Sequence, residues 1–345
     1  MDNFIQDKNY NFDILSKYTC IQNIDRIKFF KNENNTFINA ISTGYHLNKE
    51  TQIKTGGLFF FNIDNKGKLT LINENTIILN YGILDIKFNN NYSKIFTTNS
   101  DYSYSIFDFE KKEENKYKLE EENYEKNKLI SNNIMELYKD NSKSLFGTNN
   151  GFVFYEDLIK NKTISKIKSH EFGLWSIYLL NDNIYLTGSE DSYLKLWDIR
   201  ENNKNISINK SHSSSINSII QLNFNDNIIL TGSYDEKINI IDLRNFKNEI
   251  KQIKSNHMIW DIKQEKFKNN NLIFMACSYE GFNIWDINFN FDMNHLLKLP
   301  VTENEDKFHK SIVYGIDILK NENNNFIDIL SCSFYDNLIM HWNYY

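Results

Sequence analysis

Bulky aromatic residues and carboxylates recur together in the second half of the sequence. Trp175, Trp260 and Tyr314 each stand at the start of a short run in which apolar and polar residues alternate. Further tyrosines and acidic residues lie close to these positions or in the small-residue turns that follow: Tyr234, Tyr279, Tyr335, Glu171, Glu190, Glu236 and Glu280. Aromatic ring faces attract cations, and neighbouring carboxylates add to the attraction. If folding brings these groups together, we expect them to form a binding cage for a cation such as a quaternary ammonium. The alternative is that the aromatic rings only fill the central channel.

Standard catalytic and cofactor motifs are absent from the sequence. It contains no G-x-S-x-G, no H-E-x-x-H, no phosphate-binding glycine loop and no calcium loop. The three cysteines, Cys20, Cys277 and Cys332, have no C-x-x-C or Cys/His metal spacing. We therefore expect no cofactor, no metal and no disulfide framework.

Charge and hydropathy narrow the range of partners. The 345 residues carry a formal net charge of −6, which disfavours nucleic acid as a partner because phosphate binding needs a basic excess. The N-terminus is polar, and the longest apolar stretch, around Leu58–Phe61, is far too short to span a membrane. The sequence thus predicts a monomeric cytoplasmic protein that binds neither nucleic acid nor membrane.

A repeated pattern organises the chain. Each copy has a small-residue turn with an acidic residue, an alternating strand, and an aromatic or aliphatic residue followed by Asp or Asn, as in TGSEDSYLKLWDIR (187–200) and TGSYDEKINIIDLR (231–244). Weaker copies lie upstream, and the position of the Trp is held in turn by Phe61, Phe107, Tyr155, Trp197, Ile241, Trp285 and Trp342. This pattern resembles the WD40 repeat, whose blades run about 40–45 residues. Asparagine is abundant and suits the turns, because it tolerates the left-handed conformation.

The repeats predict an all-β fold, a seven-bladed WD40 β-propeller in a single domain, residues 1–345. The blades are expected to end near residues 64, 110, 158, 200, 244, 288 and 345. Because the last repeat ends at the C-terminus, its sheet lacks an outer strand. We expect a strand around residues 12–17 to fill that place, since radial closure protects the sheet edges of a propeller.

Histidines occur at a constant spacing in three of the repeats. His170, His212 and His309 each stand five residues before an entry residue of an inner strand. The WD40 resemblance implies a structural role for these histidines and for the turn aspartates Asp191, Asp235 and Asp336. His257 stands only three residues before Trp260, so its place in the repeat is doubtful and a functional role gains weight.

An ordered set of motifs carries a closer resemblance over about residues 165–345. The motifs are HEFGLW (170–175), GSEDSYLKLWDIR (188–200), TGSYDE (231–236), ACSYEGFNIW (276–285), SIVYGIDI (311–318) and SCSFYDNLIMHW (331–342). Together they resemble the WD-repeat family of diphthamide biosynthesis, the diphthine methyl ester hydrolases, also called diphthine methyltransferases. The segment SNHMIWDI departs from the family, which tends to carry glycines ahead of this Trp, and puts a catalytic role for His257 in doubt.

The resemblance implies an enzyme that hydrolyses the methyl ester of methylated diphthine on elongation factor 2. Trp175, Tyr234, Trp260 and Tyr314 would then hold the trimethylammonium group of the substrate. His170 or His257 could activate water with Glu171 as the orienting group, and Asp235 joins the same set. Cys277, Ser233 or Ser333 could instead be a nucleophile, although packing in the core is the favoured role of Cys277 and Cys332.

A non-catalytic alternative stays open. Without catalytic motifs, a propeller is typically a platform for protein complexes, for instance in trafficking or in ubiquitin-ligase assembly. An adaptor has no need of a cation cage, so an open aromatic site favours the enzyme and a filled channel favours the adaptor.

Overall fold

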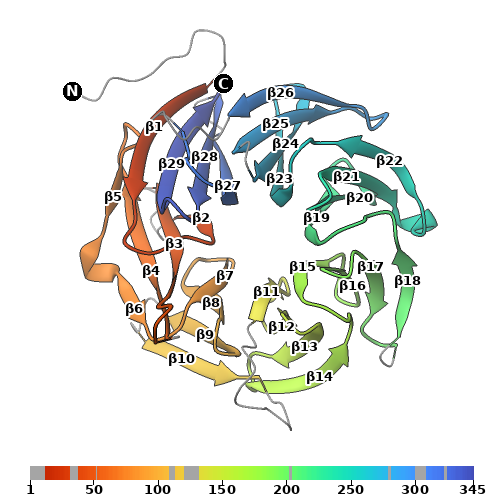
Figure 1. Ribbon diagram of the computed structural model, residues 1–345, viewed down its shortest axis with the longest axis horizontal. Coiled ribbons are helices and arrows are strands. Elements are labelled where there is room, and N and C mark those ends of the chain that lie inside the picture. Colours follow the sequence, from red (N-terminus) through yellow and green to blue (C-terminus); the bar gives the residue numbers. More distant parts are fainter. Residues whose placement is uncertain are drawn as a thin grey trace. The chain divides into compact units, whose positions relative to one another are not determined.

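The computed structural model describes residues 12–31, 38–51, 53–108, 113–119, 132–201, 204–278, 281–299, 308–321 and 325–345. These residues form seven antiparallel sheets of short strands, the blades of a β-propeller (Figure 1). The predicted fold class, an all-β seven-bladed propeller, is therefore confirmed. In the described part of the chain, no helix is long and apolar enough to cross a membrane.

The chain divides into two compact units, which are described separately. The first unit comprises residues 1–80 and 257–345, and the second comprises residues 81–256. The sheets of the first unit are β2 (Ile27–Lys31), β3 (Ile38–Leu47), β4 (Lys54–Ile63), β5 (Leu69–Leu71) and β6 (Ile77–Leu79); β23 (Ile259–Phe267), β24 (Asn270–Cys277), β25 (Phe282–Ile287) and β26 (Met293–Leu299); and β27 (Val313–Asn321), β28 (Phe326–Ser333), β29 (Leu338–Tyr344) and β1 (Phe12–Thr19).

The second unit contains four sheets of four strands each. They are β7 (Ile83–Phe88), β8 (Lys94–Asn99), β9 (Ser103–Asp108) and β10 (Glu113–Lys118); β11 (Asn132–Leu137), β12 (Lys143–Thr148), β13 (Phe152–Asp157) and β14 (Lys162–Lys168); β15 (Leu174–Leu179), β16 (Ile184–Ser189), β17 (Leu194–Asp198) and β18 (Asn205–Asn209); and β19 (Ile216–Leu222), β20 (Asn225–Ser233), β21 (Lys237–Asp242) and β22 (Glu249–Lys254). Among the described residues, each unit also contains a short 3-10 turn, η1 (Asn73–Asn75) in the first unit and η2 (Leu243–Asn245) in the second.

The first strand of the chain pairs with the last. β1 corresponds to the strand expected around residues 12–17, and it pairs antiparallel with β29 from Phe12–Tyr344 to Thr19–Leu338. Gly67, with φ of 77°, packs against this pairing, and a Cβ at its place would lie 2.3 Å from a methyl carbon of Leu15. Only glycine combines that conformation with so close an approach. The two ends of the chain thus complete one sheet together.

Burial explains why these strands form sheets packed face to face. The middle strands are buried on both faces, as in β28, where seven of eight residues are buried. The outer strands are exposed on alternate residues, as in β22. Each predicted repeat end follows the third strand of a sheet; the fourth strand comes next in the chain in six of the sheets, and in the last sheet it is β1. Sheet-to-sheet hydrogen bonds add to the packing, since Ser176 Oγ donates to the Ile216 carbonyl at 3.0 Å.

The expectation that asparagine serves at turns is also confirmed. Of the eleven described residues other than glycine with positive φ, five are asparagine: Asn141, Asn161, Asn256, Asn325 and Asn337. Their short polar side chain makes the left-handed conformation less costly than it is for most residues.

Candidate functional site

A chain of hydrogen bonds ties the loop before β15 to its sheet. His170 Nδ1 lies 2.9 Å from Asp191 Oδ2, and His170 Nε2 lies 2.7 Å from Thr187 Oγ1. Trp197 Nε1 donates to the same hydroxyl at 2.8 Å. The His170 side chain has no exposed surface, and burial lowers its pKa although Asp191 acts in the opposite direction. A neutral imidazole that donates to Asp191 and accepts from Thr187 satisfies every group in this chain.

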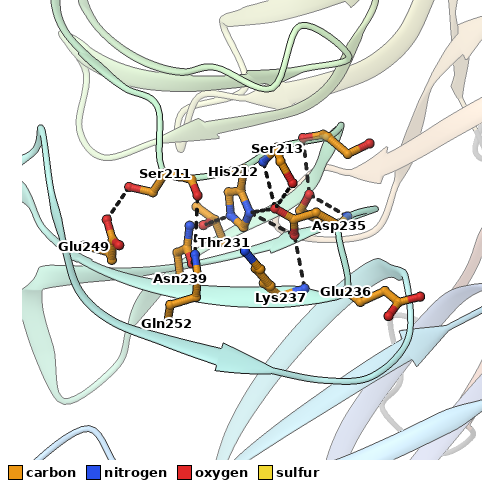
Figure 2. A network of polar contacts seen from close by, with 12 residues as sticks. Ser211, His212, Ser213, Thr231, Asp235, Glu236, Lys237, Asn239, Glu249 and Gln252 are labelled. Carbon is orange, nitrogen blue, oxygen red and sulfur yellow. Dashed lines mark hydrogen bonds and ion pairs between the residues drawn. The ribbon is translucent and has the colours of Figure 1, made fainter.

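The next sheet repeats the arrangement (Figure 2). His212 Nδ1 lies 3.0 Å from Asp235 Oδ2, and its Nε2 lies 2.8 Å from Thr231 Oγ1. The Asp235 carboxylate also accepts the backbone N–H groups of Ser213 and Lys237, at 2.9 and 3.1 Å. Burial raises the pKa of Asp235, but the hydrogen bond from His212 and the backbone donors outweigh burial, and the pKa lies below its usual value.

The third histidine is held in the first unit. His309 contacts the Ser333 and Ser331 hydroxyls, each at 2.7 Å, and Trp342 Nε1 donates to Ser331 at 2.8 Å. Ser333 in turn bonds Asp336. Burial lowers the pKa of His309, with Asp336 opposing the shift. In all three sheets the histidine and its turn aspartate are engaged in tying down a loop.

These contacts favour the structural role for His170 and Asp235. Both residues were expected among the catalytic groups, yet their polar atoms already serve neighbouring loops. Their catalytic assignment stays a prediction. Glu171, the proposed orienting group, is exposed, and its backbone N–H donates to Asp191 Oδ2 at 3.3 Å.

The entry residues of the inner strands occupy β-bulges. Pairing shifts by one residue at Trp175 in β15, at Asn217 in β19, at Trp260 in β23 and at Tyr314 in β27. A bulge leaves one residue outside the ladder and turns its side chain away from the regular alternation, which is why bulges often lie beside functional sites. The sequence thus marked the right positions without showing the backbone feature that distinguishes them.

In the second unit, the expected binding residues lie at the surface. Trp175 is half-buried, and its Nε1 donates to Glu190 Oε1 at 2.8 Å. Tyr234 is 43% exposed and follows Ser233 in the turn after β20. The Glu190 carboxylate therefore accepts a hydrogen bond from the indole N–H at the edge of the Trp175 ring and does not lie over its face.

In the first unit, four aromatic rings form a continuous row. Trp260 and Tyr314 are stacked, with ring centroids 4.5 Å apart and planes at 29°. Phe334 lies 5.3 Å from Tyr314, and Tyr45 lies 6.2 Å from Phe334. All four residues are half-buried. The structure thus places two of the four expected binding residues, Trp260 and Tyr314, in contact with each other.

Charged side chains line the strands next to this row. Lys263 Nζ lies 2.7 Å from Asp261 Oδ1, and Lys28 Nζ lies 3.3 Å from Asp317 Oδ1. Burial raises the pKa of Asp261, but the cations of Lys263, Lys28 and Arg26 outweigh burial, and the pKa lies below its usual value. Burial also lowers the pKa of Lys263. Since an ionised carboxylate beside a desolvated ammonium is costly unless paired, these groups form a mutually dependent cluster.

His257 lies in a loop that is one residue shorter than its counterparts. Eight residues, Lys168–Trp175, lead from the preceding lysine to the bulge of β15, whereas seven, Lys254–Trp260, lead to that of β23. Asn256 adopts φ of 63° in the shorter loop. His257 is half-buried, and desolvation, with a smaller effect from Lys298, lowers its pKa to about 4. Its imidazole is therefore neutral at neutral pH.

The proposed nucleophiles differ in accessibility and charge. Burial raises the pKa of Cys277 to about 12 and raises that of Cys332 as well, so both thiols stay protonated, as expected for packing residues. Ser233 and Ser333 are buried, and both hydroxyls are engaged: Ser233 Oγ donates at 3.3 Å to the Ser214 carbonyl in the loop before β19, and Ser333 Oγ donates to Asp336 in its own turn. Tyr279 and Glu280 lie outside the described residues.

Several residues of the first-unit group were missed by the sequence analysis. Tyr45 and Phe334 belong to the aromatic row, and Asp25 acts electrostatically on Tyr45. Asp25 and Tyr45 lie in the first repeat, which has no histidine from which an entry position could be counted. Asp261 had a usable signal, because it directly follows Trp260 where the corresponding repeats carry small residues, Ser176 and Gly315. Among the described residues, no group of three or more His, Cys, Asp or Glu side chains could hold a metal ion.

Comparisons with known proteins agree with the repeats and the fold. The family model described as "WD domain, G-beta repeat" matches residues 161–198 and 203–242. A Dictyostelium discoideum protein named "Diphthine methyltransferase homolog" is 29% identical over 289 residues, 77% of each chain. A chain in a crystal structure of the mitotic checkpoint complex shares the fold, with a TM-score of 0.71 and 10% identity over 95% of this chain and 94% of that chain. The chain is accordingly a β-propeller that contains WD40 repeats and is similar in sequence to a diphthine methyltransferase homolog.

Proposed function

We propose that this protein hydrolyses the methyl ester of methylated diphthine on elongation factor 2, a late step of diphthamide biosynthesis. The similarity to the diphthine methyltransferase homolog carries the proposal, because it extends over 77% of both chains. It therefore exceeds the two repeats that the general WD-domain model matches. The resemblance of the motifs between residues 165 and 345 points to the same family.

The reaction makes definite demands on a site. A water oxygen attacks the ester carbonyl carbon, the bond from that carbon to the methoxy oxygen breaks, and methanol leaves with a proton while a carboxylate remains. A base must accept the proton of the attacking water, and positive or N–H groups must stabilise the oxyanion. The substrate side chain also carries a trimethylammonium group, which aromatic rings can bind.

The first unit offers residues for each demand. Trp260 and Tyr314 supply ring faces, and the Arg26 guanidinium is a candidate donor to the oxyanion. His257 is the proposed base, since its lowered pKa keeps the imidazole able to accept a proton at neutral pH. A pKa near 4 also makes it a weak base, so its protonation limits the rate only in acid.

A mass-spectrometric assay tests the proposal. The purified full chain is mixed with elongation factor 2 that bears methylated diphthine, with and without S-adenosylmethionine, and the mass of the modified histidine is followed. Loss of one CH₂ without the cofactor is the expected result. A gain of CH₂ that needs S-adenosylmethionine overturns the proposal in favour of a methyltransferase, and no mass change with folded protein overturns it in favour of an adaptor.

Variants assign the roles within that assay. We expect His257→Gln to lower kcat about a hundredfold or more, the usual effect of removing a general base. His46→Gln is the matched control, because His46 is an exposed histidine on β3 of the same unit. Equal rates for the two variants would remove His257 from the mechanism while leaving the reaction itself intact.

A further inference from the structure

We infer that the projecting end of the β3–β4 hairpin in the first unit docks the protein that carries the substrate side chain. The contact is made by three exposed isoleucines, Ile21, Ile53 and Ile78, which together are called the docking face. Its partner is an apolar patch on the surface of elongation factor 2. The inference rests on the proposed function for the identity of this partner, and it adds a binding surface outside the residues that perform the reaction.

The hairpin of β3 and β4 is longer than its counterparts. Nine residue pairs join β3 to β4, whereas five pairs join the second and third strands in each sheet of the second unit. The pairing of β2 with β3 ends where Ile27 pairs with Ser42. The five remaining pairs of the hairpin, from Thr43 with Leu58 outward, therefore extend about 15 Å beyond the inner strand.

A third strand supports one side of the projecting end. β6 pairs with β4 at Gly56, Gly57 and Leu58 (Figure 1). A Cβ at Gly57 would lie 2.5 Å from the Ile77 carbonyl oxygen, so only glycine allows the two strands to approach so closely. The projecting end is thus a small sheet and not a loose loop.

The other side of the hairpin is fastened to the last sheet. Asn23 and Tyr45 exchange two backbone hydrogen bonds, at 3.1 and 2.9 Å. Asn23 Nδ2 also donates to the Phe334 carbonyl at 2.8 Å, in the turn after β28. A surface that is held in place before binding loses little conformational entropy when a partner docks, which favours affinity.

Two of the isoleucines lie on the same side of this small sheet. Alternate residues of a strand share a face, and so do directly paired residues. By this alternation Ile53, just before β4, points to the side of Phe59, as does Ile78, which pairs with Gly57. Ile53 and Ile78 are each 57% exposed. Phe59 is buried in one cluster with residues of β28 and β29, so this side faces the sheet that carries Tyr314.

The loop before β2 brings the third isoleucine to the hairpin. Ile21 is 77% exposed and precedes Gln22, whose side chain packs on the hairpin. A Cβ at Gly44, which pairs with Gly57, would lie 2.3 Å from Gln22 Oε1. Exposed apolar side chains that lie near one another indicate an interaction surface, whereas scattered ones do not.

The position of the hairpin beside the candidate site indicates what covers this face. Tyr45 of the hairpin is the last ring of the aromatic row, 6.2 Å from Phe334, so the hairpin borders the site. The proposed substrate is a side chain of a folded protein, and its entry brings the surface of that protein against the elements around the site. An apolar patch on that surface would cover the docking face, as in the core of protein interfaces. A small ester has no such surface.

Two substrates of different size test the docking face in the esterase assay of the full chain. They are elongation factor 2 with methylated diphthine and glycine betaine methyl ester, a small ester that also carries a trimethylammonium group. Ile53→Glu and Ile78→Glu should each raise the KM for the protein substrate about tenfold, because a carboxylate opposes burial in an apolar contact. The kcat and the hydrolysis of the small ester report whether the site is intact. An unchanged KM in both variants, or equal losses with both substrates, overturns the inference.

Matched variants separate apolar contact from charge and folding. Ile159→Glu, at an isoleucine of the second unit that is 75% exposed, should leave the KM unchanged. Ile53→Val and Ile78→Val keep an apolar surface and should retain the KM of the wild-type chain. A rise in KM for Ile159→Glu as large as for the hairpin variants would assign the effect to net charge and overturn the inference.

Binding without reaction separates this inference from the proposed function. Biolayer interferometry uses immobilised elongation factor 2 that bears diphthine, the product acid, and Ile53→Glu should bind about tenfold more weakly than the wild-type chain. Such binding without ester hydrolysis leaves the docking face standing while the proposed function fails. Hydrolysis with equal binding of both chains leaves the function standing and overturns the docking face. A wild-type dimer that Ile53→Glu dissociates in sedimentation would make a second copy the occupant and also overturn the inference.

Discussion

The sheets β15–β18 and β23–β26 begin from similar repeats and use their polar residues differently. In the first, His170, Asp191, Thr187 and Trp197 form one closed chain of hydrogen bonds. In the second, Met275 pairs with Ile262 just as Thr187 pairs with Ile177. Its thioether cannot replace the hydroxyl.

The tryptophans show the consequence. Trp197 Nε1 has its acceptor, whereas the buried Trp285 Nε1 finds no hydrogen-bond partner in the described structure. The loop before β23 is also one residue shorter, and its histidine is half-buried and carries a lowered pKa. The β15–β18 sheet uses its histidine, hydroxyl and indole groups to hold its own loop, whereas in the β23–β26 sheet Met275 cannot accept a hydrogen bond as Thr187 does, and Trp285 Nε1 has no partner among the described residues.

The largest predicted difference is between the losses in unfolding free energy on replacing His170 and on replacing His257. We expect His170→Ala to lower the free energy of unfolding by about 2–4 kcal/mol, because it leaves buried Asp191 and Thr187 without their partner. His257→Ala should change it by less than about 1 kcal/mol, since the His257 side chain is only half-buried and its removal leaves a smaller buried gap than removal of His170. Urea unfolding followed by circular dichroism measures both.

His212→Ala serves as the positive control for that pair. It interrupts the same kind of chain, between Asp235 and Thr231, and should resemble His170→Ala. A larger loss for His257→Ala than for His170→Ala would reverse the comparison and make the loop before β23 the structural one.

The pH dependence of stability should follow the buried histidines. Burial lowers the pKa of His170 and of His309 in the folded state, so the unfolded chain takes up protons first. Their contribution is complete above the ordinary histidine pKa of about 6.5 and is lost as the pH falls below it, by about 1.4 kcal/mol for each unit of lowering. Urea midpoints should therefore be lower at about pH 5.5 than at about pH 7.5.

The carboxylates of Asp191 and Asp235 contribute to stability over a different pH range from the histidines. The pKa values of Asp191 and Asp235 lie below the usual value of 3.8, so their contribution is still present at about pH 5.5 and is lost only in stronger acid. A His170→Asn variant should show a smaller change between the two pH values. Identical midpoints for the wild-type chain would contradict a neutral buried histidine.

A smaller effect is expected from the tryptophans. Trp197→Phe removes a donor that Thr187 uses and should cost about 1–2 kcal/mol. Trp285→Phe removes an N–H group that has no acceptor in the described structure, so part of the packing loss is offset and the cost should be lower. The difference between the two urea midpoints is the quantity to measure, and equal losses would mean that Trp285 Nε1 is satisfied after all.

Much of the fold could be predicted because the repeat is a packing pattern. Phe61, Phe107, Tyr155 and the later equivalents all lie on the third strands of their sheets, and the strand pairing of β1 with β29 follows from a last repeat that lacks an outer strand. Alternation and spacing encode such features directly. The division into two compact units had no counterpart in composition, since no linker interrupts the chain.

The candidate site was less predictable, for physical reasons. Trp260 and Tyr314 could be found because they interrupt positions that repeats usually fill with small or polar residues. Asp25 could not be found from the sequence, because its repeat lacks the histidine and the Trp from which equivalent positions are counted in the other repeats. The contact between Trp260 and Tyr314 depends on two bulges, and a bulge is a backbone shift that alternation alone does not specify.

The aspartate–arginine pairs of the WDIR and IDLR motifs should contribute least to the stability of the fold. In WDIR and IDLR, Arg200 and Arg244 each form a two-pronged contact with the aspartate two residues earlier, with guanidinium-to-carboxylate distances of 2.6–2.9 Å in the first. The hydrogen bonds of Arg200 lower the pKa of Asp198 to about 2, yet the arginine side chains are 65% and 70% exposed. Water and salt screen such pairs, and ordering a long side chain opposes them. We expect Arg200→Ala and Arg244→Ala to leave the urea midpoint unchanged at 0.15 M salt. A clear loss that shrinks at high salt would show that exposed charge pairs, and not only the buried histidine chains, hold the second unit's sheets together.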